Sequence, residues 1–141
     1  MTTPLLADQD AEDSVEIMIA WLLPLGRAAE ERITGDVLPF RLVAHVAGDE
    51  NVDEGTAAPI VSVHTMTEKA LGRNNLKTET RTTHKRILRL GTHCDPIQLT
   101  DGRWVGVDYV DVVESPLYLP YGDDLILRKV GRYELGLTYN P

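Results

Sequence analysis

The sequence predicts an α+β fold in which helices pack on one face of a mainly antiparallel sheet. Two segments carry apolar residues at helical spacing, and several others alternate apolar and polar residues as half-buried strands do. An Asp-Gly pair between two strand-like segments predicts a hairpin turn. The segments follow one another in the order α-β-β-α-β-β-β.

The size and composition of the chain indicate one globular domain. Its 141 residues suit a single core, and hydrophobic residues make up 43% and charged residues 26% of the total. Residues 1–12 are acidic and too polar for a core, so we predict a flexible N-terminal arm before a single domain at 13–141. The formal net charge of −8 argues against nucleic-acid binding over the whole surface, because phosphates need a positive field.

The most apolar stretch is DSVEIMIAWLLPLG, residues 13–26, and it predicts the first helix. Asp13 stands at its start and Glu16 follows three residues later, which is the arrangement of a capping box. The uninterrupted apolar run is nine residues long. A membrane span needs ~20 residues, so this helix must be buried in protein.

The apolar residues of this helix exceed what one sheet can cover. One stripe has helical spacing and consists of Val15, Met18, Ile19, Leu22 and Leu25. Ile17, Trp21 and Leu23 lie off that stripe, on the side that a surface helix of a monomer usually keeps polar. We therefore expect these three residues to form a second surface that contacts another subunit.

Two strands follow the first helix. Apolar residues that alternate with Arg41 and His45 predict a strand at 38–47, and β-branched residues predict another at 59–67. Between them lies an acidic, glycine-flanked loop at 48–58, which favours a hairpin of the two strands.

The remaining segments complete the predicted order. Residues 27–36 fit either a helix or a strand. The second helix is expected at 68–90, with a break at its GRNN motif. Residues 96–114 give the strongest hairpin signal, with the Asp-Gly pair at the turn. Residues 125–139 predict a long strand with one buried face, because apolar residues share one parity: Leu125, Leu127, Tyr133, Leu135, Leu137 and Tyr139.

No residue pattern predicts a catalytic, metal or cofactor site, and we expect no enzymatic activity. The four histidines lack HxH and HExxH spacing, and neither a P-loop nor a GxGxxG motif occurs. The cluster His93-Cys94-Asp95 could place a base beside a thiol, but a loop with Cys94 as a small apolar filler is the favoured interpretation. A single cysteine cannot form an intrachain disulfide, which fits a reducing compartment.

Five carboxylates could form paired acids or a cation site: Asp108, Asp111, Glu114, Asp123 and Asp124. They fall on predicted strands and a turn rather than in a compact loop with calcium-ligand spacing. A solvated strand face is therefore the favoured interpretation. A small hydrolase or a metal-binding protein is the least favoured functional class.

A row of basic residues recurs every four positions along the second helical segment: Lys69, Arg73, Lys77, Arg81, Lys85 and Arg89. With Arg86, this basic row holds half of the lysines and arginines of the chain, and only two glutamates oppose it between 68 and 89. It is either a solvated helix face or a surface for acidic protein or DNA, and it would suit head-to-tail ring contacts. The candidate contact residues are Lys77, Arg81, Lys85 and Arg89.

Seven segments between residues 15 and 137 resemble, in the same order, the tail terminator proteins of siphophages, especially those that infect mycobacteria and related actinobacteria. They are VEIMIAWLLPLG, GDVLPFRLVAHVAG, VSVHT, THKRILRL, DGRWVGVDYVDVVESP, PYGDD and RYELGL. The single motifs are degenerate, and their order and spacing carry the resemblance.

The resemblance implies a structural role in the virion, at the head-tail junction, after assembly in the cytoplasm of a bacterial host. Such proteins are similar in fold to the phage lambda tail terminator, a small α/β subunit that forms a hexameric ring. The ring caps the completed tail tube, ends its polymerisation and presents the surface that the head connector, or stopper, binds. DNA passes through the ring without sequence-specific binding, and no cofactor or membrane is implied.

One other structural role shares these features. A head-to-tail connector, or a minor tail subunit, would have a similar size, charge and tendency to form rings. The position of the chain in an assembled particle separates these roles from that of a tail terminator.

Overall fold

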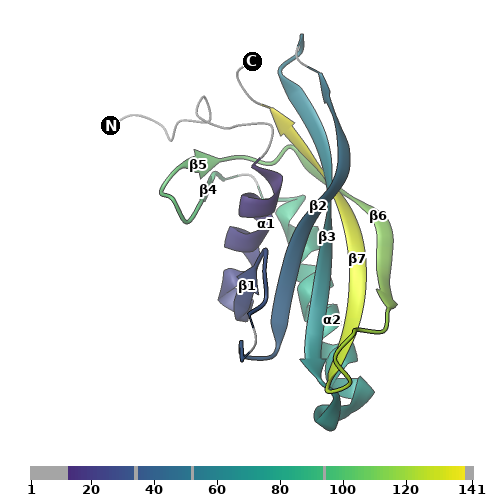
Figure 1. The fold of residues 1–141 in the computed structure, drawn as a ribbon. Helices are drawn as coiled ribbons and strands as arrows, with labels where there is room; N and C mark the ends of the chain where they lie inside the picture. The colour runs from purple at the N-terminus through teal and green to yellow at the C-terminus, as the bar shows by residue number, and fades with distance from the viewer. Residues whose placement is uncertain (1–12, 34, 52, 94, 139–141) are drawn as a thin grey trace.

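A computed structural model describes residues 13–33, 35–51, 53–93 and 95–138 (Figure 1). The predicted arm at 1–12, Cys94 and the end of the chain lie outside the described residues. The model confirms an α+β fold with a mainly antiparallel sheet and the predicted order of its main elements. The five-stranded sheet has the strand order β1-β2-β3-β7-β6, and only the pair β1–β2 is parallel.

The N-terminal half contains the elements α1 (Ser14–Leu22), η2 (Leu23–Leu25), β1 (Arg27–Ala29), β2 (Phe40–Asn51) and β3 (Thr56–Glu68). The C-terminal half contains η3 (Lys69–Leu71), α2 (Gly72–Leu90), β4 (Ile97–Gln98), β5 (Trp104–Val105), β6 (Tyr109–Tyr118) and β7 (Ile126–Thr138). The short strand β1 resolves the ambiguous segment 27–36 in favour of a strand. The GRNN motif stands at the start of α2, directly after the 3-10 turn η3.

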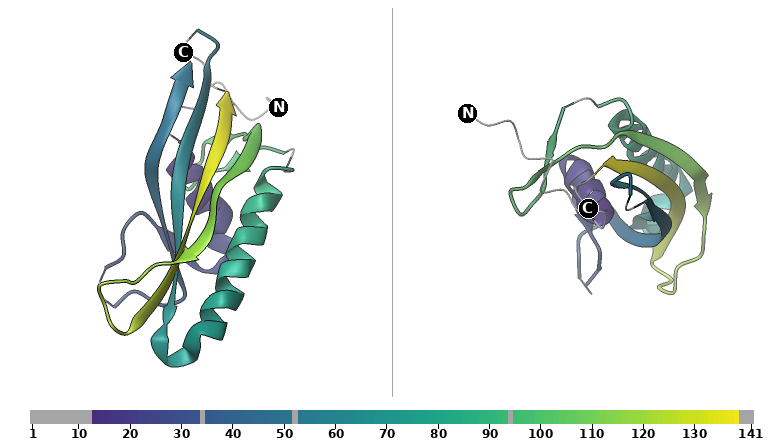
Figure 2. Two further views of the ribbon diagram at one scale, coloured as in Figure 1. Left: turned by 90° about the vertical axis from the view of Figure 1, so that its right-hand side faces the viewer. Right: turned by 90° about the horizontal axis from the view of Figure 1, so that it is seen from above.

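Both helices pack on one face of the sheet and form a common core with it. Figure 2 shows α2 running alongside the strands. The helices bury Val15, Ile17, Met18, Leu22, Ile87 and Leu90, and the strands contribute Val43, Val61, Val63, Tyr133, Leu135 and Leu137. Burial of this apolar surface is the main force that holds the layers together.

The first helix is buried on more sides than its sequence predicts. Ile17 has 0% of its surface exposed, so the expectation that it lies on a free apolar side is wrong. Besides the sheet, α1 contacts α2 and the small strand β4. The surplus apolar residues of this helix are therefore covered largely by elements of the same chain that lie far away in the sequence.

Asp13 does not cap α1 with its side chain, so the predicted capping box is wrong. Its two carboxylate oxygens instead accept hydrogen bonds from Arg103, at 3.0 and 2.8 Å. The Asp13 side chain is buried. The hydrogen bonds that Arg103 donates to Asp13 and Asp101 raise the pKa of the Arg103 guanidinium. This ion pair fastens the β4–β5 turn to the start of α1.

The Asp101-Gly102 turn is confirmed, but the strand that follows it is interrupted. Residues 97–98 and 104–105 form a separate two-stranded sheet, and β6 leaves this hairpin to pair with β7. On β7 the predicted apolar parity is buried from Leu127 onward, whereas Leu125 precedes the strand and is 74% exposed. Tyr139, the last residue of the predicted parity, lies outside the described residues.

The hairpin of β2 and β3 is longer than expected, because strand pairing continues through most of the predicted loop 48–58. Residues 47–51 pair with residues 56–60, and only the tip of the loop is unpaired. Gly48 makes this possible, since its φ is +145° and a Cβ there would come 2.4 Å from the Cα of Pro59. Figure 1 shows the hairpin projecting past the ends of both helices.

Candidate functional site

The basic row lies along the outer side of α2 and is exposed at every position from Lys69 to Arg89. The opposite side of the helix is buried and consists of Leu76, Thr80, Thr83, Ile87 and Leu90. No described residue forms an ion pair with any of the four candidate contact residues Lys77, Arg81, Lys85 and Arg89. These four side chains are available for contact on one continuous face.

The only acidic residue in the sequence of α2, Glu79, points inward instead of balancing the row. Its carboxylate lies 2.7 Å from the guanidinium of Arg41, which is 0% exposed. Arg41 also donates to the hydroxyl of Thr83 at 2.9 Å and to the carbonyl oxygen of Leu25 at 3.4 Å. Each of the three guanidinium nitrogens therefore has an acceptor, as a buried ion requires.

The sequence did not reveal the burial of Arg41, because the alternation of apolar and polar residues at 38–47 placed Arg41 on the solvent side of the strand. Arg41 and Val43 face the helices, whereas Phe40 belongs to a smaller cluster with Met66 and Ile126. One local signal could have revealed the pair, namely a single glutamate among the six basic residues of α2.

Of the other predicted contact residues, Trp21 is half-buried and Leu23 is 39% exposed. The indole Nε1 of Trp21 donates to the carbonyl of Arg86 at 2.6 Å, and the guanidinium of Arg86 lies 4.3 Å from the ring centroid. Trp21 therefore joins α1 to α2 within the chain. Contact of Trp21 and Leu23 with another subunit stays a prediction.

The residues proposed as a thiol site do not form an oriented group among the described residues. The imidazole of His93 stacks against Trp21 with the ring centroids 4.8 Å apart, and Asp95 is exposed. Cys94 itself lies outside the described residues. Among the residues that the structure describes, no group of three or more His, Cys, Asp or Glu residues could hold a metal ion.

The five candidate carboxylates fall into two separate groups. Asp108, Asp111 and Glu114 lie on or before β6, whereas Asp123 and Asp124 lie in the turn before β7. Asp123 accepts a hydrogen bond from the backbone N–H of Leu125 at 2.9 Å, which is a turn contact. The five side chains are thus not brought together in one site.

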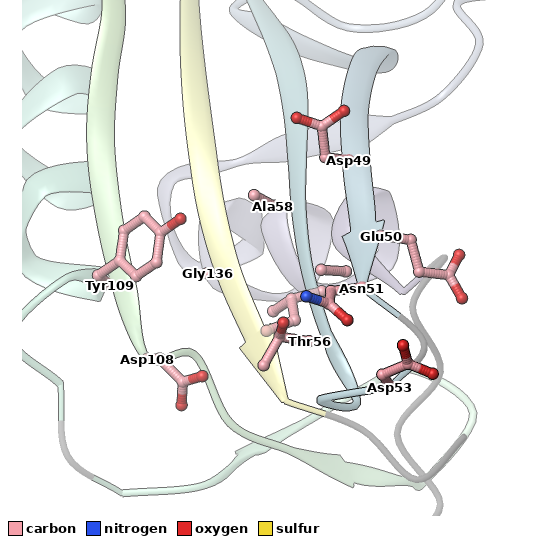
Figure 3. Close-up of a pocket in the computed structure, with 11 residues that line it drawn as sticks. Asp49, Glu50, Asn51, Asp53, Thr56, Ala58, Asp108, Tyr109 and Gly136 are labelled. Carbon is pink, nitrogen blue, oxygen red and sulfur yellow. The ribbon is translucent and has the colours of Figure 1, made fainter.

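A pocket of about 760 Å³ lies between the β2–β3 hairpin and the start of β6 (Figure 3). Its charged lining residues are all acidic: Asp49, Glu50, Asp53 and Asp108. The ring of Tyr109 covers Gly136, where any larger residue would collide with it, and the phenol donates to Glu134 at 2.8 Å. This hydrogen bond raises the pKa of Tyr109 to about 12. The lining offers carboxylates to a cationic group.

His64 lies on β3, on the face of the sheet away from the helices. Its Nδ1 is 3.4 Å from the guanidinium of Arg128, which can only donate, and its Nε2 is 3.1 Å from the Ser62 hydroxyl. Burial, followed by the positive charges of Arg128 and Arg132, lowers the pKa of His64 to about 4. The ring is therefore neutral at physiological pH and links β3 to β7.

The edge strand β6 exposes apolar side chains on both of its faces. Tyr109, Val112, Val113, Leu117 and Tyr118 are each 39–57% exposed. Within the described residues, only β7 pairs with this strand. A long apolar edge of this kind readily pairs with another chain, so it is a second candidate contact surface. No helix in the described part of the chain is long and apolar enough to span a membrane.

Comparison with known proteins shows similarity at the level of the fold. No protein-family model matches the chain, and no curated protein matches it. Its fold is similar to that of a chain in a solved structure described as the virion of a native gene transfer agent (GTA) particle. The TM-score is 0.52 at 11% sequence identity, and the match covers 91% of this chain and 89% of that chain. The shared fold thus extends over nearly the whole of both chains.

Proposed function

We propose that this chain is a tail terminator, a structural protein of a phage virion. In this role it forms a ring on the completed tail tube, ends tube polymerisation and presents the joining surface for the head connector. The function consists of binding and assembly, without a catalytic step or a cofactor.

The observation that carries this proposal is the fold likeness to a chain from the virion of a gene transfer agent particle. The match is not confined to a single element, because it covers about nine-tenths of each chain. The ordered resemblance of seven segments to siphophage tail terminators narrows the role from virion subunit to terminator.

The surface of the chain supports an assembly role. The basic row on α2 and the acidic pocket beside the β2–β3 hairpin are separate surfaces, and the apolar edge of β6 adjoins both, because Tyr118 contacts Arg73 and Tyr109 lines the pocket. A subunit that contacts both neighbours in a ring needs two different surfaces of this kind, and further contacts join it to other proteins.

The proposed partners are other copies of the chain in a hexameric ring, the tail tube protein and the head-tail connector or stopper. DNA passes through the ring without sequence-specific binding, which suits a chain with a net charge of −8. The proposed location is the head-tail junction of the virion, after assembly in the cytoplasm of the bacterial host.

Tail length in phage that lack this chain tests the proposal. We expect particles made without it to carry no joined heads and to form tubes of abnormal, mostly excessive length, because nothing stops addition of tube subunits. Supplying the wild-type chain from a plasmid should restore tails of uniform length, as measured by negative-stain electron microscopy. Tails of normal length that fail only to join heads would contradict a terminator role and favour a connector.

A further inference from the structure

We infer that the basic row of α2 is the docking surface for the acidic end of the β2–β3 hairpin of a second copy of this chain. The acidic end comprises residues 48–51 and 53–59. This inference rests on the proposed ring, and it names the two surfaces that meet at each subunit contact.

The basic row is poorly explained by the needs of the isolated chain. Like charges four residues apart on a helix repel one another, and Arg86 has its pKa lowered by burial and by the neighbouring charge of Arg89. Glu79, which could balance the row, is held by the buried Arg41. An external source of negative charge would remove this repulsion.

The hairpin carries the complementary charge. Asp49, Glu50, Asp53 and Glu54 lie within six residues, and the sequence has no lysine or arginine between 42 and 68. Neither Asp49 nor Asp53 forms an ion pair with a described residue. Figure 3 shows both side chains beside the pocket, with Asp108 on its other side.

The hairpin also offers space for basic side chains. The pocket of about 760 Å³ is large enough for the end of a lysine or arginine side chain. Leu88 in α2 is 42% exposed, and Val46 in β2, two residues before Gly48, is 43% exposed. An apolar contact can therefore accompany the charges.

The positions of the two surfaces favour a ring. The basic row follows α2 along the side of the sheet, whereas the acidic hairpin projects beyond one end of the helices (Figures 1 and 2). A contact between them is head-to-tail, and each added copy leaves one surface of each kind free. Such contacts form a ring when the rotation between neighbouring copies closes, as the proposed function requires. DNA is the less favoured occupant of the row, because it would offer nothing to Leu88 and would be repelled by the net charge of −8.

Charge reversal on either surface, followed by mixing, tests this inference. Lys77→Glu, Arg81→Glu and Lys85→Glu leave the four candidate contact residues net acidic, and Asp49→Lys, Asp53→Lys and Glu54→Lys leave the hairpin net basic. We expect each of these two variants alone to self-associate about tenfold more weakly than wild type, or worse, in sedimentation velocity at low salt. An equimolar mixture should recover assembly with both variants in equal copies, because every contact then joins opposite charges.

The matched control is Glu30→Lys with Glu31→Lys, which reverses two exposed acids outside both the hairpin and the basic row. It should assemble as wild type does and should not restore assembly of the acidic-row variant. Circular dichroism checks that each variant is folded. Unchanged assembly of both charge-reversal variants, no recovery in the mixture, or a wild-type chain that stays monomeric at low salt and high concentration would overturn the inference.

A second measurement uses the wild-type chain. Carbodiimide joins a carboxylate to a lysine amine in direct contact, and three of the four lysines lie in the basic row. We expect intermolecular cross-links from Lys77 or Lys85 to Asp49 or Asp53, and none from Lys129. Cross-links confined to other pairs would contradict the contact. Normal assembly with lost DNA retention in the acidic-row variant would assign the row to DNA.

The two proposals can fail separately. If the charge-reversal results contradict the contact while the chain still occupies the end of the tail tube, only the inferred contact falls. If the mixture assembles but the chain is absent from the tail, the contact stands and the proposed function falls.

Discussion

Replacement of Glu79 by alanine is expected to lower the free energy of unfolding by about 3–5 kcal/mol, because it leaves the buried guanidinium of Arg41 without its counter-charge. The pair is separated by 2.7 Å, and Arg41 is 0% exposed whereas the Glu79 side chain is 27% exposed. Guanidinium chloride denaturation followed by circular dichroism measures the loss.

Two further variants separate the buried charge from other causes. Glu68→Ala removes an exposed carboxylate at the end of β3 and should cost less than about 0.5 kcal/mol. Adding Arg41→Met to Glu79→Ala should recover most of the lost stability, because a buried apolar side chain needs no counter-charge. If Glu79→Ala costs less than about 1 kcal/mol, or Arg41→Met makes it worse, the account of this pair is wrong.

Ile17→Ala is expected to lower the free energy of unfolding of the monomer by about 2–5 kcal/mol, because it leaves a cavity between α1 and the sheet. Leu23→Ala removes a side chain directly after the same helix, but Leu23 is 39% exposed, so it should cost less than about 1 kcal/mol. Thermal and chemical denaturation of the two variants at a concentration where the chain is monomeric provide the comparison.

The opposite result would support the sequence-based expectation that Ile17 contacts another subunit. If Ile17→Ala leaves the monomer as stable as wild type but weakens self-association, then Ile17 belongs to a subunit contact rather than to the core. An equal loss of stability in Ile17→Ala and Leu23→Ala would also contradict the difference in burial between these two side chains.

Local patterns in the sequence were sufficient for the fold class and most elements. Hydrophobic periodicity identified α1, α2 and the buried parity of β7 from Leu127 onward, because those patterns record which side of an element meets the core. The turn at Asp101-Gly102 was also recognisable, since glycine there has a φ of +93°. These features depend on neighbours within a few residues.

The errors arose where distant segments decide the environment. The burial of Ile17 depends on α2 and β4, and the position of Arg41 inside the core depends on Glu79 and Thr83. Asp13 looked like a helix cap because its partner, Arg103, is ninety residues away. No local pattern records such a pairing.

The candidate surfaces were predicted only in part. The exposure of the basic row follows from its composition and was expected. The acidic end of the hairpin was expected as a loop, and its pocket is formed only when β6 pairs with β7 beside it. The complementary relation of the two surfaces therefore required the fold.

The most direct test of the terminator role is the position and copy number of this chain in an assembled particle, determined by cryo-electron microscopy of the head-tail junction. The proposed function predicts a closed hexameric ring of this chain between the last ring of the tail tube and the head connector. The inferred contact predicts that α2 of each copy faces the β2–β3 hairpin of the next. A particle with one or two copies, or with the chain in the capsid or at the tail tip, would contradict the proposed function.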